Sequence, residues 1–168
     1  MNDSKFSETY HSFSGADIVS VFTPKGGKPV VFGTLQTITY SVYRPTTQVY
    51  VLGQAMPSGF VRGHRTIAGT LIFTVFDRHV LYNAIKYGYS VNDPKCLNIK
   101  PDELPPFDVT INFLNEYGES SRLTIKDVRI ISEGQTMSIE DRITENTMQY
   151  IAADIDMMTP DVYEDWKE

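Results

Sequence analysis

The chain has 168 residues, a hydrophobic fraction of 41% and a formal net charge of −6 at pH 7. This length suits one domain spanning residues 1–168, with enough apolar side chains for a core. No window of about 18 consecutive apolar residues occurs, so we expect no transmembrane helix. The single cysteine, Cys96, excludes an internal disulfide and is typical of a reducing compartment.

Charge is distributed unevenly along the sequence. Residues 1–90 contain 8 Lys and Arg against 4 Asp and Glu, whereas residues 91–168 contain 7 against 17. The simplest interpretation is two differently solvated faces. A sharper one is a subunit whose opposite surfaces carry opposite charge and stack head to tail. A net acidic chain binds DNA phosphates poorly, but an acidic surface is a suitable lining for a channel through which DNA slides.

The first half of the chain predicts β-strands. Residues 18–22 and a return strand from Val30 flank the glycine pair of residues 24–29, which indicates a hairpin, and Gly33 interrupts the return strand as a bulge or bend. Residues 34–43 alternate as a strand does, residues 44–47 break it, and residues 49–52 are strand-like again before a loop. Residues 61–76 predict one long strand with an apolar face.

The second half predicts one helix and further strands. Asp77 is a good N-cap, residues 78–87 have helical spacing and Gly88 is a plausible stop. The proline-containing loop at 90–106 is long enough to suggest a contact role or a lid. The other expected elements are a hairpin of residues 108–114 and 122–131, a turn at 133–135, a strand or short turn at 137–141, and a last strand at 147–157 that buries Met148, Tyr150, Ala152 and Ile155.

These elements favour a mainly β fold, an antiparallel β-sandwich or barrel with one short flanking α-helix and long interface loops. Within the long strand, Gly69 stands among bulky neighbours and indicates a close approach of another segment. Asp154 and Asp156 alternate with apolar residues, so they are expected to share one face of the last strand, most simply a solvated one.

No pattern indicates catalysis, a cofactor or a metal site. The three histidines, His11, His64 and His79, lack the spacing of metal ligands. Residues 25–28 (KGGK) look like a phosphate loop, but Pro29 stands where such a loop needs Ser or Thr, so a hairpin turn is favoured. We therefore predict a protein that is not an enzyme and carries no cofactor.

The strongest basic cluster is residues 62–65 (RGHR). Phosphate contact is one interpretation. Ion pairing with the acidic half of a neighbouring copy is favoured, because guanidinium forks match carboxylates. The candidate subunit-interface residues are Arg62, His64, Arg65, Arg44, Lys25 and Lys28.

Several runs of the sequence together resemble a known family. They are residues 13–18 (FSGADI), 33–41 (GTLQTITYS), 62–71 (RGHRTIAGTL), 104–110 (LPPFDVT), 115–118 (NEYG) and 133–141 (EGQTMSIED). Over roughly residues 12–158 the chain is similar to virion structural proteins of tailed bacteriophages, in the group of tail tube and tube-associated baseplate proteins.

The resemblance implies a tail-tube-like domain that joins copies of itself into rings, commonly sixfold, stacked about a central channel for DNA ejection. DNA would pass without specific binding, and other tail or baseplate proteins would be partners. Residues 1–14 would be an N-terminal arm and residues 159–168 an acidic tail, while segments 24–29, 44–60 and 90–106 would reach neighbouring copies. Such a protein is made in the bacterial host cytoplasm and resides in the virion tail.

Two alternatives remain open at this point. The first is a baseplate, tube-initiator or connector protein of the same fold, present as a single ring. The second, from another class, is a cell-wall-binding or hydrolytic tail module.

Overall fold

A computed structural model describes residues 13–75, 81, 85–86, 100–114, 120–137 and 144–160. Its elements are β1 (Ile18–Pro24), β2 (Val30–Val31), β3 (Leu35–Tyr43), β4 (Thr46–Val49), β5 (Gly59–Arg62), β6 (Thr66–Thr74), β7 (Phe107–Leu114), β8 (Ser120–Thr136), β9 (Glu145–Ala152), β10 (Asp154–Pro160) and the 3-10 turns η1 (Gly15–Asp17) and η4 (Pro101–Glu103). Every strand pairing among them is antiparallel.

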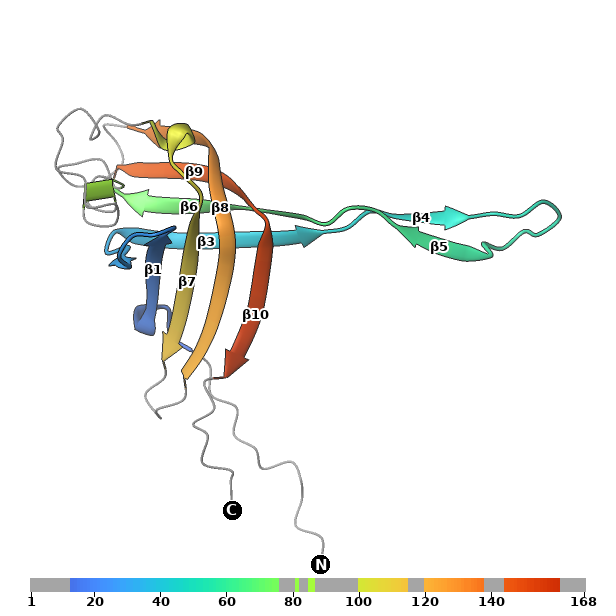
Figure 1. Cartoon of the computed structure of the whole chain (residues 1–168), viewed down its shortest axis with the longest axis horizontal. Coiled ribbons are helices and arrows are strands. Elements are labelled where there is room, and N and C mark those ends of the chain that lie inside the picture. Colours follow the sequence, from blue (N-terminus) through green and yellow to red (C-terminus); the bar gives the residue numbers. More distant parts are fainter. Residues whose placement is uncertain are drawn as a thin grey trace, which may run out of the picture.

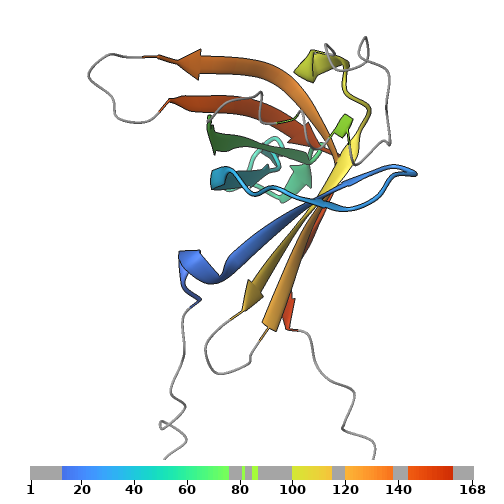
Figure 2. The ribbon, with the colours of Figure 1, turned by 90° about the vertical axis from the view of Figure 1, so that its left-hand side faces the viewer.

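Eight strands form one sheet that the long strand β8 divides into two half-sheets. The order is β2-β1-β7-β8-β9-β6-β3, and β10 also pairs with β8. The first part of β8 lies between β7 and β10, and its second part pairs with β9. We call β2-β1-β7-β8-β10 half-sheet A and β8-β9-β6-β3 half-sheet B; Figures 1 and 2 show them lying crosswise.

β8 and the continuous segment formed by β9 and β10 bend at the same corner. Asp127 of β8 has a φ of 58°, and its N–H donates to Asp108 Oδ1 at 2.8 Å. Ala153, between β9 and β10, donates its N–H to the Lys126 carbonyl at 3.1 Å. Aspartate adopts the left-handed conformation more readily than most residues. The shared bend lays one half-sheet over the other, as strands do when they pass between orthogonally packed layers.

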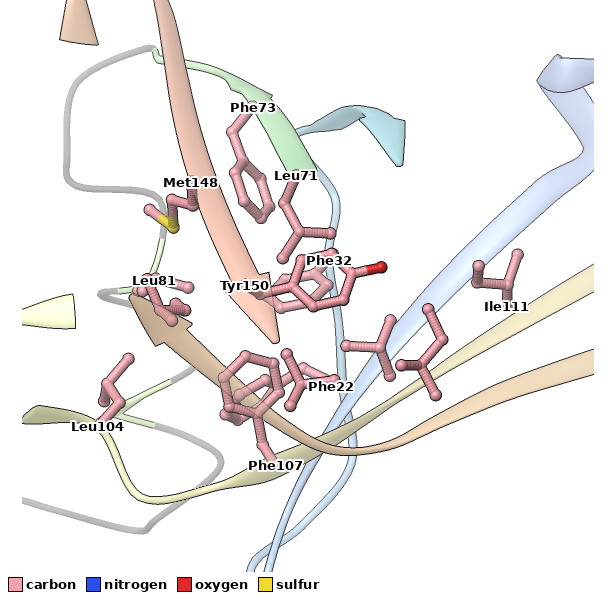
Figure 3. Packing of buried hydrophobic residues seen from close by; sticks show 14 of the residues in the cluster. Phe22, Phe32, Leu71, Phe73, Leu81, Leu104, Phe107, Ile111, Met148 and Tyr150 are labelled. Carbon is pink, nitrogen blue, oxygen red and sulfur yellow. The ribbon is translucent and has the colours of Figure 1, made fainter. Parts of the chain in front are cut away.

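The core fills the angle between the half-sheets (Figure 3). The Phe22 and Phe107 rings of half-sheet A lie 4.6 Å apart, and the Phe32 ring lies 5.3 Å from that of Phe73 in β6. Burying an aliphatic or aromatic side chain of this size contributes about 1.5–3 kcal/mol. The fully buried set also includes Leu71, Leu81, Ile125, Val128, Met148 and Tyr150. The predicted mainly β, antiparallel fold is confirmed, although one folded sheet makes both layers.

The close approach expected at Gly69 is present in half-sheet B. A Cβ built on Gly69 would lie 2.0 Å from the Thr39 carbonyl oxygen and 2.7 Å from the Tyr150 hydroxyl. That hydroxyl donates to the same Thr39 oxygen at 2.8 Å. Burial raises the pKa of Tyr150 to about 12. Glycine is therefore required here because a backbone carbonyl and a hydrogen-bonded phenol occupy the space of a side chain.

Several predicted boundaries were wrong. Residues 61–76 contain parts of two strands, because β5 ends at Arg62 and β6 begins at Thr66. Between them, the Gly63 N–H donates to the Pro45 carbonyl at 2.8 Å. β4 begins inside the predicted break, and residues 50–52 lie outside any strand. The predicted turn at 133–135 belongs to β8, where Glu133 accepts a hydrogen bond from buried Asn146.

The last predicted strand is likewise two strands, separated at the corner. Its burial is confirmed for Met148, Tyr150 and Ile155, whereas Ala152 is half-buried. Asp154 and Asp156 are exposed on either side of buried Ile155 and so share a face, as expected.

The predicted helix at 78–87 lies largely outside the described residues. Of its positions, Leu81 and Ile85 are buried, and the Ile85 N–H donates to the Leu81 carbonyl at 2.8 Å. The part of the chain that the structure describes holds no α-helix of seven or more residues and, accordingly, no helix long and apolar enough to cross a membrane. Residues 90–99 of the predicted loop and residues 138–141 also lie outside the described residues.

Candidate assembly surfaces

A two-stranded arm projects from half-sheet B (Figure 1). It consists of β4, β5 and the connecting residues 50–58, and it continues β3 and β6 beyond the sheet. Many of its apolar side chains are exposed, among them Tyr50, Val51, Leu52, Met56, Phe60 and Val61. An isolated two-stranded hairpin is marginally stable in water, and a run of exposed apolar side chains marks a contact surface. The arm is therefore a candidate docking element.

Three arginines meet where the arm leaves the sheet. Arg44, Arg62 and Arg65 line a groove of about 560 Å³. The Arg44 Nε–H donates to the Gly63 carbonyl at 2.8 Å, which fixes this side chain across the base of the arm. The other lining residues are Val42, Thr46, Ile155 and Met157. We call this site the arm-base groove.

The arm-base groove brings together three of the six predicted interface residues, Arg44, Arg62 and Arg65. His64 lies in the same connection between β5 and β6 and is exposed, but it does not line the groove. A Cβ at Gly63 would lie 2.8 Å from the Pro45 ring, so a glycine lets the two strands of the arm base approach. The sequence did not point to Ile155 and Met157, because contact between β10 and the arm base depends on the corner.

The two lysines of the predicted set lie elsewhere. Gly26 has a φ of 77°, and the Gly27 N–H donates to the Pro24 carbonyl at 3.1 Å, which confirms the hairpin turn. Lys25 Nζ lies 2.7 Å from Asp127 Oδ1, and this hydrogen bond lowers the pKa of Asp127. Lys25 thus reinforces the corner within its own chain, and Lys28 is exposed; neither lines the arm-base groove.

Half-sheet B has two free edges. β3 pairs only with β6, and residues 129–136 of β8 pair only with β9 among the described strands. Because every step from β3 to β8 is antiparallel, these two edges run in opposite directions. Free edges expose unpaired N–H and C=O groups that another strand can pair with.

The outer face of half-sheet B is nearly uncharged. The Thr39 and Thr70 hydroxyls lie 2.7 Å apart, and the Ser132 hydroxyl donates to Gln149 Oε1 at 3.1 Å. The register places on this face Thr37, Thr39, Ser41, Tyr43, Thr66, Ala68, Thr70, Ile72, Thr74, Thr147, Gln149, Ile151, Ser132, Gly134 and Thr136, with Arg129 and Glu145 as its charged members in the described strands. Hydroxyl and amide groups therefore dominate its chemistry.

The described residues offer little for catalysis. They contain no group of three or more His, Cys, Asp or Glu that could hold a metal ion. Asp156 pairs with Lys126 at 2.5 Å, and this contact raises the pKa of Lys126. His11, His79 and Cys96 lie outside the described residues.

Comparison with known proteins identifies the fold through solved structures. No protein-family model and no curated protein sequence matches the chain. Solved structures match it over nearly its whole length. A chain of the sixfold-symmetrised anti-feeding prophage baseplate has a TM-score of 0.62 at 13% identity and covers 92% of this chain and 97% of its own.

Two further structures extend the likeness to tubes. In the sheath-tube complex of the extracellular contractile injection system PVC, a chain has a TM-score of 0.60 at 12% identity, covering 94% of this chain and 99% of its own. For the SPP1 tail tube the TM-score is 0.52 at 11% identity, with 90% and 81% covered. The chain thus has the fold found in tail tubes and in the baseplate and tube of injection systems, as the sequence resemblance implied.

Proposed function

We propose that this protein is a structural subunit, not an enzyme, that assembles with copies of itself into rings of the tube of a bacteriophage tail or related tail-like particle. The observation that carries the proposal is half-sheet B, with two free edges of opposite direction, on a fold shared with tube proteins. Such edges are complementary between copies, because β3 of one copy can pair antiparallel with residues 129–136 of the next.

Repeating this pairing around an axis closes a barrel. The similar baseplate is sixfold symmetrised, and six copies of the four-stranded half-sheet B would supply about 24 strands. With strands about 4.8 Å apart, such a barrel has a radius of roughly 18 Å before tilt is added. The remaining mass of six 19.0 kDa copies does not fit inside that radius, so it lies outside the barrel. The outer face of half-sheet B then lines the channel.

This arrangement changes the expected chemistry of the channel. The sequence suggested an acidic lining, whereas the face proposed to line the channel carries mainly Thr, Ser and Gln. A neutral surface offers DNA phosphates neither cations to bind nor an array of anions to repel them. Passage without specific binding is consistent with such a wall.

The arm would hold neighbouring copies together. Leu52 is fully exposed and Met56 is 79% exposed, so both side chains gain contacts if the arm lies on the next subunit. Segment 44–60 therefore remains our main candidate for contacts beyond the shared barrel.

Assembly and edge pairing are tested together. Purified protein is examined by sedimentation and negative-stain microscopy over a concentration series, and hydrogen exchange is compared between monomer and assembly. We expect rings or tubes, with amide protection gained in β3 and in residues 129–136. A monomer at every concentration would contradict the proposal, and so would protection confined to the edges of half-sheet A.

A tube-initiating or baseplate ring is the second candidate, supported by the likeness to the baseplate chain. Quantitative mass spectrometry of purified particles separates the two. A tube subunit is present in many multiples of one ring, whereas an initiator is present as a single ring. The same preparation identifies the particle as a phage tail or an injection system.

A further inference from the structure

We propose that the arm-base groove binds the acidic, aromatic segment 161–168 of a second copy. The inference rests on the proposed function, because it names a contact between subunits. It assigns a ligand class, a carboxylate-bearing peptide with apolar side chains, to a groove that the described residues of its own chain do not fill.

The groove concentrates positive charge that the described residues do not neutralise. Arg44, Arg62 and Arg65 all line it, and none of the three forms an ion pair with a described carboxylate. The nearby carboxylate of Asp156 is held by Lys126 instead. Single exposed ion pairs contribute little, but several guanidinium groups around one groove favour bidentate recognition of carboxylates.

The groove also has an apolar lining. Val42 of β3 and Ile155 and Met157 of β10 contribute to it, and Met157 is 57% exposed. A ligand that fills the groove therefore needs carboxylates for the three arginines and an aromatic or aliphatic side chain for the apolar residues. Aromatic anchors beside arginines are frequent at the centres of protein interfaces.

The position of the groove favours a peptide over DNA. Val42 pairs with Ile67, which is buried, so the β3 side chain that enters the groove is on the core side of half-sheet B. The face proposed to line the channel is the opposite one. A nucleic acid in the channel would not meet these arginines, whereas a neighbouring subunit outside the barrel would.

Segment 161–168 (DVYEDWKE) has the required chemistry. Asp161, Glu164, Asp165 and Glu168 are interleaved with Val162, Tyr163 and Trp166. It follows β10, which starts beside the arm base and ends at Pro160, roughly 16 Å from Ile155 at about 3.3 Å per residue (Figure 1). The strand thus ends away from its own groove.

Binding is measured with the full-length protein and a dye-labelled peptide of residues 159–168. We expect saturable fluorescence anisotropy that weakens at least tenfold for the R62E/R65E chain and for a peptide with Asp161, Glu164 and Asp165 amidated to Asn or Gln. A peptide carrying E164K and D165K should regain affinity for the R62E/R65E chain. Equal binding of the acidic and amidated peptides would overturn the proposal, as would tighter binding of a DNA oligonucleotide of the same length.

Trp166 is the only tryptophan, so its fluorescence reports on the segment within the intact chain. We expect its protection from iodide quenching to rise with protein concentration and to disappear in R62E/R65E. Protection independent of concentration would place the segment in its own groove and overturn the role of a second copy. A wild-type chain that assembles into tubes but shows no saturable peptide binding would refute this inference alone, whereas a wild-type chain that binds the peptide but never forms rings would refute only the proposed function.

Discussion

Replacing Gly69 with alanine should destabilise the folded subunit by about 3 kcal/mol. The new Cβ would lie 2.0 Å from the Thr39 carbonyl oxygen, whereas real Cβ contacts stay beyond 3.0 Å, so β3 and β6 must separate by about 1 Å at this pair. Overpacking of this kind costs about 1–3 kcal/mol. Displacing the Tyr150 hydroxyl from Thr39 costs a further ~1–2 kcal/mol, and the intrinsic gain of alanine over glycine in a strand offsets about 0.5–1 kcal/mol.

Thermal unfolding of the dilute monomer measures the effect. For a chain of this length, ~3 kcal/mol corresponds to a loss of roughly 6–12 °C in Tm. Gly134→Ala is the matched control: Gly134 also lies in half-sheet B, has no positive φ, and nothing lies within 4 Å of its built Cβ, so its Tm should change little. If G69A unfolds within about 2 °C of both the wild type and G134A, the steric reasoning is refuted.

Three further perturbations test the fold and the arm. Burial raises the pKa of Tyr150 to about 12 from an ordinary value of 10.0, so the contribution of its neutral form to the free energy of unfolding is complete below pH 10 and falls by roughly 2–3 kcal/mol as the pH rises to 12. Tyr150→Phe should flatten the dependence of unfolding free energy on pH over this range. The same pH dependence in the wild type and the variant, measured by denaturant titration at each pH, would contradict the assignment. At the corner, Asp127→Gly should be more stable than Asp127→Ala by about 1 kcal/mol, because only alanine keeps the cost of a positive φ while both lose the Lys25 pair; equal midpoints in urea would show that the bend is not strained. On the arm, Leu52→Asp combined with Met56→Asp should leave the monomer Tm within about 2 °C and reduce ring formation in sedimentation at least tenfold, and unchanged ring formation would contradict a role of the arm in assembly.

The sequence predicted best where side-chain alternation alone decides the structure. Residues 107–112 alternate strictly between buried and partly buried, and the strand was located within one residue. Met148, Tyr150 and Ile155 were likewise identified as core from spacing. Gly69 was singled out because a residue without a side chain among bulky neighbours indicates that another group occupies the space.

The failures share a physical origin in contacts that join distant segments. Residues 133–135 have the composition of a turn, yet pairing with β9 and the Asn146–Glu133 hydrogen bond keep them extended. The corner at Asp127 depends on Asp108 and Lys25, 19 and 102 residues away in sequence. The arm-base groove could be predicted only in part, because Arg62 and Arg65 are close together in sequence while Ile155 and Met157 come from the distant β10.

The bend shared by β8 and β9–β10 also bears on how the protein matures. Because β8 belongs to both layers and β9 continues into β10 across the same corner, the described strands of one copy enclose a buried core by themselves. Synthesis and polymerisation are then separable events, and a pool of finished monomers can wait for a nucleating template. Natural variation in the protruding hairpin can retune which neighbours it accepts while the interior stays constant.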